Sequence, residues 1–240
     1  MRRVVRGPAG VRCATGAPAR RLAGAHDHPH PRIPTPGGTL LLEERDESDW
    51  DAPLAPSGAS APPAAVALGK FDAMHRGHRA LASAAASTGG TPWLLSFSGM
   101  AAALGWPPRS PLVAPDDRGR VLGSWAAACR GTAPRQRVIP FGCVREMEPG
   151  EFVRALADSL GAAHVVVGAG YRFGHRAAGD EHMLKELCAE RGVGVTVVPL
   201  VAAGGDGAGD GPATPVSSSA VRGSLAEGLV ASVEGLLGRR

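Results

Sequence analysis

The sequence is poor in cysteine and contains no long apolar run. Its 240 residues include four cysteines, and no two of them form a Cys-x-x-Cys pair. A disulfide framework and a structural zinc site are therefore not expected. No stretch approaches the roughly 18 consecutive apolar residues of a membrane-spanning helix, so no membrane partner is expected either.

Negative charge is almost missing from one part of the chain. Residues 1–40 hold seven arginines and one acidic residue, whereas the rest of the chain holds 19 basic and 21 acidic residues, which explains a net charge of +4. A body so close to neutrality, with no stripe of basic side chains, gives little support to nucleic-acid binding. Lysine is also rare, with two residues against 24 arginines, a ratio that indicates GC-rich coding.

The first 40 residues are predicted to be an organelle transit peptide. They are rich in Arg, Ala, Gly and Pro and lack the apolar core of a secretory signal. His26, His28 and His30 alternate within them, and we interpret these histidines as part of a disordered spacer and not as a metal site. This composition by itself does not distinguish one organelle from another.

An acidic run over 43–51 and a Pro/Ala/Ser linker over 52–64 follow. Both compositions are typical of solvated chain. We therefore predict that residues 1–64 are a disordered leader and linker and that residues 65–240 form one folded domain. Deletion of residues 1–60 should then leave folding and activity intact.

Short apolar runs alternate with segments of helical periodicity throughout the folded part. Five strands are predicted near 65–68, 93–97, 137–141, 164–167 and 193–200, and helices are predicted near 77–88, 116–129, 152–160, 183–188, 217–228 and 229–237. This alternation predicts an α/β fold with a parallel five-stranded sheet and helices on both faces. Ligands of such sheets bind in loops at the carboxyl ends of the strands.

The loop after the first predicted strand carries the clearest chemical signal. It reads Gly69-Lys70-Phe71-Asp72-Ala73-Met74-His75-Arg76-Gly77-His78 and opens the first predicted helix. A helix N-terminus offers backbone N–H groups to an anion, and two histidines three residues apart can face the same way. The pattern indicates phosphoryl or nucleotidyl transfer, although two histidines in this place could also be surface or capping residues.

This loop resembles the His-x-Gly-His signature of the nucleotidyltransferase superfamily, in the form found in the adenylyltransferase module of FAD synthetases. Later blocks are similar to the same family in the same order. They are Val166-Val167-Gly168 with Tyr171-Arg172-Phe173-Gly174 and Gly179-Asp180, then Val216-Ser217-Ser218-Ser219-Ala220-Val221-Arg222, then Leu236-Leu237-Gly238-Arg239. The segments Leu94–Met100 and Leu104-Gly105-Trp106 resemble the plant plastid branch in particular. This resemblance implies a plastid location, with the mitochondrion as the alternative.

The resemblance implies a Rossmann-like nucleotidyltransferase fold and the reaction ATP + FMN → FAD + pyrophosphate, with Mg²⁺ and with no residue assigned to the metal. It implies no riboflavin kinase activity, because the matching part ends at Gly238-Arg239, and it says nothing about oligomeric state. The residues that it assigns are His75, His78 and Arg222 to catalysis, Gly69, Phe71, Gly77, Ser217 and Ser218 to the nucleotide, and Phe97, Ser98, Tyr171 and Phe173 to the flavin.

Two other functions stay open at this point. One is another nucleotidyltransferase of the superfamily, acting on nicotinamide mononucleotide or phosphopantetheine. The other is a protein that binds FMN and ATP without catalysis.

Three positions depart from the family's usual residues. Ala73 replaces a glycine, Ala169 a carboxylate, and Gly170 an amide or carboxylate. If Gly170 has lost a polar ligand contact, Gly170→Asn should restore it and raise kcat/KM. If the backbone at residue 170 needs a positive φ, the substitution should only cost stability.

Overall fold

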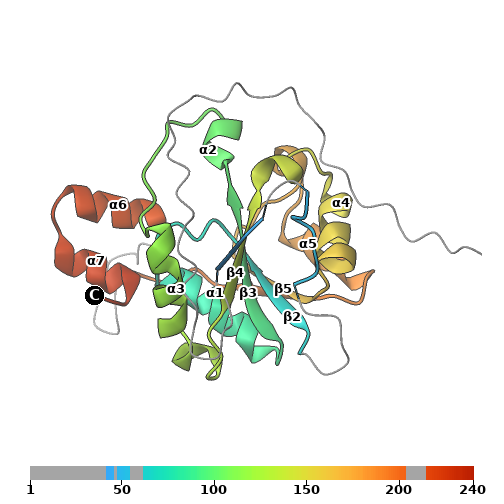
Figure 1. Cartoon of the computed structure of the whole chain (residues 1–240), viewed down its shortest axis with the longest axis horizontal. Helices are drawn as coiled ribbons and strands as arrows, with labels where there is room; N and C mark the ends of the chain where they lie inside the picture. Colours follow the sequence, from blue (N-terminus) through green and yellow to red (C-terminus); the bar gives the residue numbers. More distant parts are fainter. Residues whose placement is uncertain (1–41, 46–47, 55–61, 204–214) are drawn as a thin grey trace, which may run out of the picture.

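The structure is a computed structural model that describes residues 42–45, 48–54, 62–203 and 215–240 (Figure 1). The predicted transit peptide over residues 1–40, including His26, His28 and His30, lies outside the described residues. None of the helices in the described part of the chain combines the length and the apolar composition needed to cross a bilayer.

A six-stranded parallel sheet forms the centre of the protein, with the strand order β1-β4-β3-β2-β5-β6. The strands are β1 Leu42–Glu44, β2 Ala64–Leu68, β3 Thr91–Ser98, β4 Arg135–Pro140, β5 Ala162–Gly168 and β6 Gly194–Val198. The five strands predicted from apolar runs are present, and the α/β fold class is confirmed.

The sixth strand corrects the predicted boundary of the folded part. Leu42–Glu44 pairs with β4, and Trp50 and Leu54 are buried in the core beneath the sheet. The expectation of a solvated acidic run over 43–51 is therefore wrong for the described residues, as is the five-strand count. The acidic composition misled because Glu43 neutralises arginines of β4 instead of facing water.

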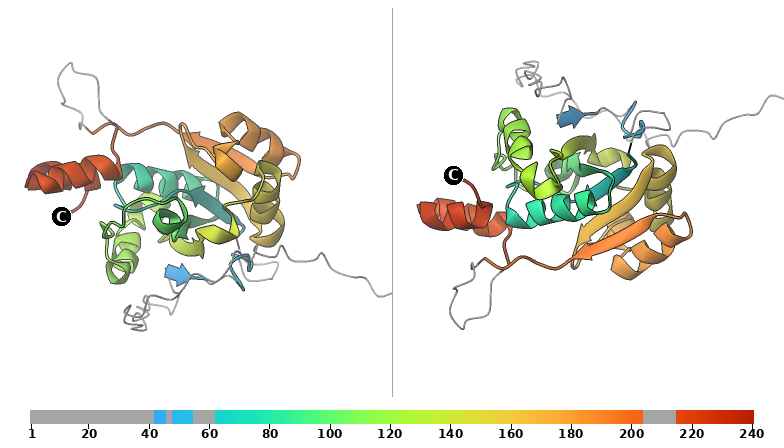
Figure 2. Two further views of the ribbon diagram at one scale, coloured as in Figure 1. Left: turned by 90° about the horizontal axis from the view of Figure 1, so that it is seen from above. Right: turned by 90° about the horizontal axis from the view of Figure 1, so that it is seen from below.

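Helices cover both faces of the sheet, as predicted. The α-helices are α1 Arg76–Ser87, α2 Met100–Ala103, α3 Pro115–Ser124, α4 Pro149–Arg154, α5 Glu181–Ala189, α6 Ser218–Ala226 and α7 Val230–Leu237. Shorter 3₁₀ segments are η1 Ala127–Cys129, η2 Phe141–Cys143 and η4 His175–Ala177, and the π-helical segment η3 Ala155–Ser159 continues α4. Figure 2 shows α6 and α7 projecting to one side of the sheet.

Alternation along β2 sends side chains into two separate cores. Val66 and Leu68 face the core that contains residues of α4 and α5, and Ala65 and Ala67 face the core that contains residues of α1 and α3. Burial on both faces explains why β2 reads as an uninterrupted apolar run.

The strand order reverses at β2, which lies between β3 and β5. In an open parallel sheet, loops that leave such a point in opposite directions create a crevice at the carboxyl ends of the strands. The loop after β2 and the loop after β5 flank this crevice, and both carry blocks singled out in the sequence.

Candidate active site

The loop between β2 and α1 has an unusual backbone. Phe71 and Met74 both have a φ of 48°, a left-handed conformation that costs residues with a Cβ roughly 1–2 kcal/mol each. Two arginines hold the loop: Arg118 Nη2 donates to the Phe71 carbonyl at 2.7 Å, and Arg239 Nη2 donates to the Ala73 carbonyl at 3.0 Å. Strain that is over-determined in this way is typical of functional loops.

His75 and His78 bind each other at the start of α1. His75 is the N-cap: its Nδ1 accepts from the backbone N–H of His78 at 3.3 Å, and His78 Nδ1 accepts from the backbone N–H of His75 at 3.3 Å. Their rings stack with centroids 3.6 Å apart. Since both Nδ1 atoms accept, a neutral ring must carry its proton on Nε2.

Burial keeps both imidazoles neutral. It lowers the pKa of His75 to about 4, with the positive charge of Arg239 as a second cause. Burial also lowers the pKa of His78, with smaller contributions from the charges of His75, Arg118 and Arg239. The pair therefore offers two neutral N–H donors and not two imidazolium charges.

These pKa shifts predict that acid destabilises the fold. Unfolded His75 takes up a proton near pH 6.5, whereas the folded form resists protonation until about pH 4, so stability is lost as the pH falls between these values. Between pH 7 and pH 5 the loss from His75 should be about 2 kcal/mol. Urea unfolding at the two pH values measures it. His75→Asn, which retains an acceptor for the cap, should show a smaller loss than wild type, and His182→Asn, on the exposed surface of α5, should not differ from it.

The glycines of the signature make room for these rings. A Cβ on Gly77 would lie 3.1 Å from the His75 ring, and a Cβ on Gly69 would lie 3.2 Å from the ring of Phe71. Phe71 itself is fully buried and contacts the His78 ring edge-on at 5.0 Å. This part of the signature thus builds the shape of the loop.

Two cavities open above the carboxyl ends of the strands. The first, which we call the polar cavity, has a volume of about 660 Å³ and is lined by residues of the loops after β2 and β3 and of α6. Its lining comprises Lys70, Asp72, Phe97, Gly99, Met100, Ala101, Trp106, Pro107, Arg109, Pro111, Ser218, Ser219 and Arg222.

Arg222 and Ser218 fasten α6 to the wall of the polar cavity. Arg222 Nη2 lies 2.8 Å from Asp72 Oδ2 and 2.7 Å from the carbonyl of Ser110, and Ser218 Oγ accepts from the backbone N–H of Ala73 at 3.3 Å. Ser217 instead caps α6 by accepting from the N–H of Ala220. In the serine block, Ser217 therefore caps a helix, whereas Ser218 lines the polar cavity.

The second cavity, which we call the aromatic cavity, has a volume of about 610 Å³. Tyr171 and Phe173 stack with centroids 6.2 Å apart, and Phe97 meets Phe141 edge-on at 6.1 Å. Phe152 also lines the cavity. Four of the five phenylalanines and the single tyrosine of the chain gather here.

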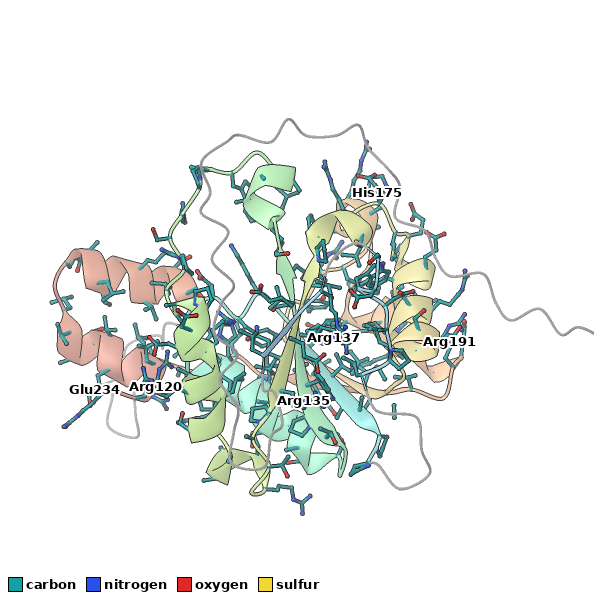
Figure 3. The ribbon with its side chains drawn as sticks, viewed as in Figure 1. Arg120, Arg135, Arg137, His175, Arg191 and Glu234 are labelled. Carbon is teal, nitrogen blue, oxygen red and sulfur yellow. The ribbon has the colours of Figure 1, made fainter. Side chains whose placement is uncertain are left out.

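Charged side chains surround the aromatic cavity on one side. Arg145, Arg172 and Arg176 line it, together with His175 and Glu146. His175 Nε2 lies 3.3 Å from a Glu146 carboxylate oxygen, and Figure 3 shows His175 at the end of the sheet where the strands finish. An anionic group attached to a planar ring would find basic partners there.

The structure brings half of the predicted site residues to the cavities. Gly69, Phe97, Tyr171 and Phe173 line the aromatic cavity, and Phe97, Ser218 and Arg222 line the polar one. The remaining six lie outside both linings: His75, His78, Phe71, Gly77, Ser217 and Ser98. Ser98 Oγ donates to the Ile139 carbonyl at 3.4 Å, which connects β3 to β4.

Sequence reasoning overlooked four residues of this region. Lys70 and Trp106 lie within quoted motifs but received no role, and Arg239 was noted only as part of a closing motif. Phe141 is the last residue of a predicted strand. This position could have indicated a site residue, because the carboxyl ends of parallel strands lie at one edge of the sheet, where ligands bind.

Two of the three departures from the family pattern have no strained backbone. Ala73 has an ordinary negative φ and packs, fully buried, against α6 and α7, so its methyl group is accommodated. Ala169 is exposed and donates its N–H to the Val198 carbonyl at 2.9 Å. Neither position requires the residue that the family usually has.

Gly170 has a φ of +80°, and a Cβ there would meet no atom within 4 Å. The position is exposed and lines neither cavity. Because the backbone requires left-handed geometry, we expect Gly170→Ala to cost roughly 1–2 kcal/mol of stability and Gly170→Asn less. Neither variant should bind FMN or ATP more tightly. Thermal unfolding and titration of both variants test this, and a tighter-binding Gly170→Asn would restore the ligand-contact hypothesis.

The described residues contain no group of three or more His, Cys, Asp or Glu that could hold a metal ion. Asp72 is the one carboxylate among the residues lining the polar cavity, and it already binds Arg222 and the backbone N–H of Leu112. Mg²⁺ often binds through substrate phosphates and few carboxylates.

Comparison with known proteins gives one consistent family. The FAD synthetase family profile matches residues 138–208. FAD synthetase 2, chloroplastic, of Arabidopsis thaliana is 46% identical over 180 residues, which cover 72% of this chain and 49% of the relative. FAD synthetase 1, chloroplastic, of the same plant is 46% identical over 182 residues, 72% of this chain and 51% of the relative. An FAD synthetase of Listeria monocytogenes is 32% identical over 93 residues, 39% of this chain and 35% of that protein.

The chain thus spans about half the length of the plant relatives that it matches. A solved structure titled as a macrolide-efflux protein from Streptococcus pneumoniae superposes with a TM-score of 0.65 at 20% identity, covering 84% of this chain and 62% of that one. At this identity the likeness concerns the fold alone, and it agrees with the α/β architecture described above.

Proposed function

Because its relatives place this chain in the FAD synthetase family, of the plant plastid type, we propose that it transfers the adenylyl group of ATP to FMN, which yields FAD and pyrophosphate. The observation that carries the proposal is the aromatic cavity. Aromatic residues make up only 4% of the chain, yet Phe97, Phe141, Phe152, Tyr171 and Phe173 line one cavity. A planar ring system is the ligand that such a lining suits.

We assign one substrate to each cavity. The flavin ring of FMN would occupy the aromatic cavity, and ATP the polar cavity, where Arg222, Ser218 and Ser219 provide donors for phosphate oxygens. Nε and Nη1 of Arg222 take no part in its bonds to Asp72 and Ser110. The guanidinium is therefore oriented by the protein while part of its fork is left for an anion.

Adenylyl transfer requires the protein to position the two substrates and does not require a covalent intermediate with the protein. A phosphate oxygen of FMN forms a bond with the α-phosphorus of ATP, the bond from this phosphorus to the bridging oxygen breaks, and pyrophosphate leaves with the electron pair. Catalysis of such a transfer rests on aligning the two substrates and stabilising charge on the transferring group. His75 and His78 would contribute neutral N–H donors beside the N-terminus of α1. Mg²⁺ bound to the ATP phosphates would neutralise part of their charge.

The proposal is tested with the full chain, FMN, ATP and Mg²⁺, with FAD read by chromatography and pyrophosphate by a coupled assay. Nicotinamide mononucleotide and phosphopantetheine serve as competing acceptors. Adenylylation of either in place of FMN would select another nucleotidyltransferase. Binding of FMN and ATP without release of pyrophosphate would select a non-catalytic relative.

Phe141 tests the aromatic cavity directly. Phe141→Leu removes the edge-on partner of Phe97 while keeping an apolar side chain. We expect the KM for FMN to rise about 2- to 10-fold, from the 0.5–1.5 kcal/mol that an aromatic contact contributes. The KM for ATP should stay unchanged, and Phe141→Tyr should behave as wild type. Equal rises in both KM values would argue against FMN in this cavity.

Three further statements belong to the proposal. The chain carries out adenylyl transfer and not the riboflavin kinase reaction; formation of FMN from riboflavin and ATP by the purified protein would contradict this.

The proposed location is the plastid, as the names of its plant relatives suggest for them, and these names give the mitochondrial alternative no support. A fluorescent fusion that stays in the cytosol would contradict the plastid location. Its partners are ATP and FMN, without nucleic acid or membrane.

A further inference from the structure

Lys70 lies on the wall that separates the two cavities. Three residues line both of them, namely Lys70, Phe97 and Met100. Lys70 is the one charged side chain among the three. Arg109 and Arg222 reach only the polar cavity, and the arginines of the aromatic cavity reach only that one.

Among the described residues, the Lys70 ammonium contacts an aromatic ring and no acidic side chain. None of the ion pairs found among the described residues involves Lys70, whereas Arg222 is paired with Asp72 at 2.8 Å. Nζ of Lys70 lies instead over the ring of Trp106, 5.4 Å from its centroid. A cation–π contact at an exposed site is weak, so a phosphate oxygen would compete with it successfully.

We propose that Lys70 is a catalytic residue that binds the transferring phosphoryl group at the junction of the two cavities. The inference rests on the proposed function, because it requires the FMN phosphate to enter from the aromatic side and the α-phosphate of ATP from the polar side. At their meeting point the bond from the FMN oxygen to the α-phosphorus forms as the bond to pyrophosphate breaks, and no proton needs to move. A positive charge on the shared wall contacts both groups.

Trp106 is the aromatic partner of Lys70 and lines the polar cavity. Its side chain is 49% exposed and belongs to the loop after α2 that lines the polar cavity. The Lys70 ammonium lies over its ring. When the α-phosphate enters, the flexible lysine side chain moves from the indole to the phosphate, and the surroundings of Trp106 change.

The first experiment compares Lys70→Met, Lys70→Arg and Lys185→Met. Lys185 is the other lysine of the chain, exposed on α5 and absent from the linings of both cavities, so its variant is a matched control. We expect Lys70→Met to lower kcat about 100-fold, as for loss of one preorganised donor to developing charge, with smaller changes in both KM values. Lys70→Arg should recover at least ten-fold of that loss, and Lys185→Met should equal wild type.

The second experiment follows tryptophan fluorescence as pyrophosphate or ATP is added without FMN. Wild type should show a change in emission that Trp106→Phe abolishes, and Lys70→Met should lose more than half of it. An unchanged response in Lys70→Met would overturn the movement of the lysine.

The outcomes separate the two proposals. If wild type makes FAD and Lys70→Met retains kcat within three-fold, Lys70 has no catalytic role while the proposed function stands. If wild type makes no FAD, the proposed function fails, and the role of Lys70 fails with it. Circular dichroism of each variant shows that a loss of kcat does not come from unfolding.

Discussion

Replacing Glu43 with alanine is expected to lower the free energy of unfolding by roughly 3–5 kcal/mol, because it leaves a buried arginine without its counter-ion. Arg137 is only 1% exposed, and its Nε and Nη2 donate to Glu43 Oε2 at 3.1 and 2.8 Å. Arg135 and Arg45 bind the same carboxylate. One acidic residue of β1 therefore forms ion pairs with three arginines.

The surroundings of Arg137 leave it no other partner of opposite charge among the described residues. Its remaining donors bind the backbone carbonyls of Ala52 and Pro53, and its guanidinium lies 5.5 Å from the ring centroid of Trp93. Figure 3 shows Arg135 and Arg137 close together over the sheet. The carbonyls satisfy hydrogen bonds but not charge, so the loss of Glu43 is not compensated.

Urea unfolding of Glu43→Ala and Glu44→Ala measures the effect. Glu44 is the next residue of β1 and is exposed, so its variant should change the free energy of unfolding by less than about 0.5 kcal/mol. Equal effects in the two variants would mean that the charge cluster is dispensable. The same reasoning reverses the expectation for deletion of residues 1–60, which removes β1, Trp50 and Leu54 and should destabilise the protein.

Replacing His78 with alanine is expected to lower turnover by roughly 100-fold or more, while FMN binding changes little. Losing one donor to charge that develops during transfer costs about 3 kcal/mol. His78 is half-buried between the rings of Phe71 and His75. Its Nδ1 accepts from the backbone N–H of His75, so this variant also loses half of the reciprocal cap. Turnover alone would not separate the two effects.

His78→Asn separates them. Its amide oxygen can accept from the backbone N–H of His75, as Nδ1 does, but it lacks a donor at the position of Nε2. We expect this variant to unfold at nearly the wild-type temperature and still to lose most of its turnover. Near-normal turnover in His78→Asn would mean that the histidines only cap α1, a possibility consistent with their place outside the lining of both cavities.

Local sequence was enough to predict most of the fold. The strands β2, β3, β5 and β6 consist largely of apolar residues, β4 contains the shorter apolar pair Val138-Ile139, and α1 and α5 show their buried faces as helical periodicity. These signals depend on neighbours within a few residues, so they survive without knowledge of the tertiary structure. The same holds for the aromatic block around Tyr171, which lies in a loop that directly follows β5.

Contacts between distant parts of the chain decided the rest. In the sequence, Glu43 is one acidic residue in an acidic run. In the structure it binds Arg137, which lies 94 positions later in the chain. In the sequence, Lys70 is only one of two lysines. Its place in the lining of both cavities became visible only in the folded structure. His75 and His78 were recognised from their spacing, but both of their pKa values are lowered by burial in the folded protein and by the charge of the distant Arg239. The charge around a side chain, its exposed fraction and the lining of a cavity all depend on residues that are far apart in the sequence. For that reason only the tertiary structure determined them.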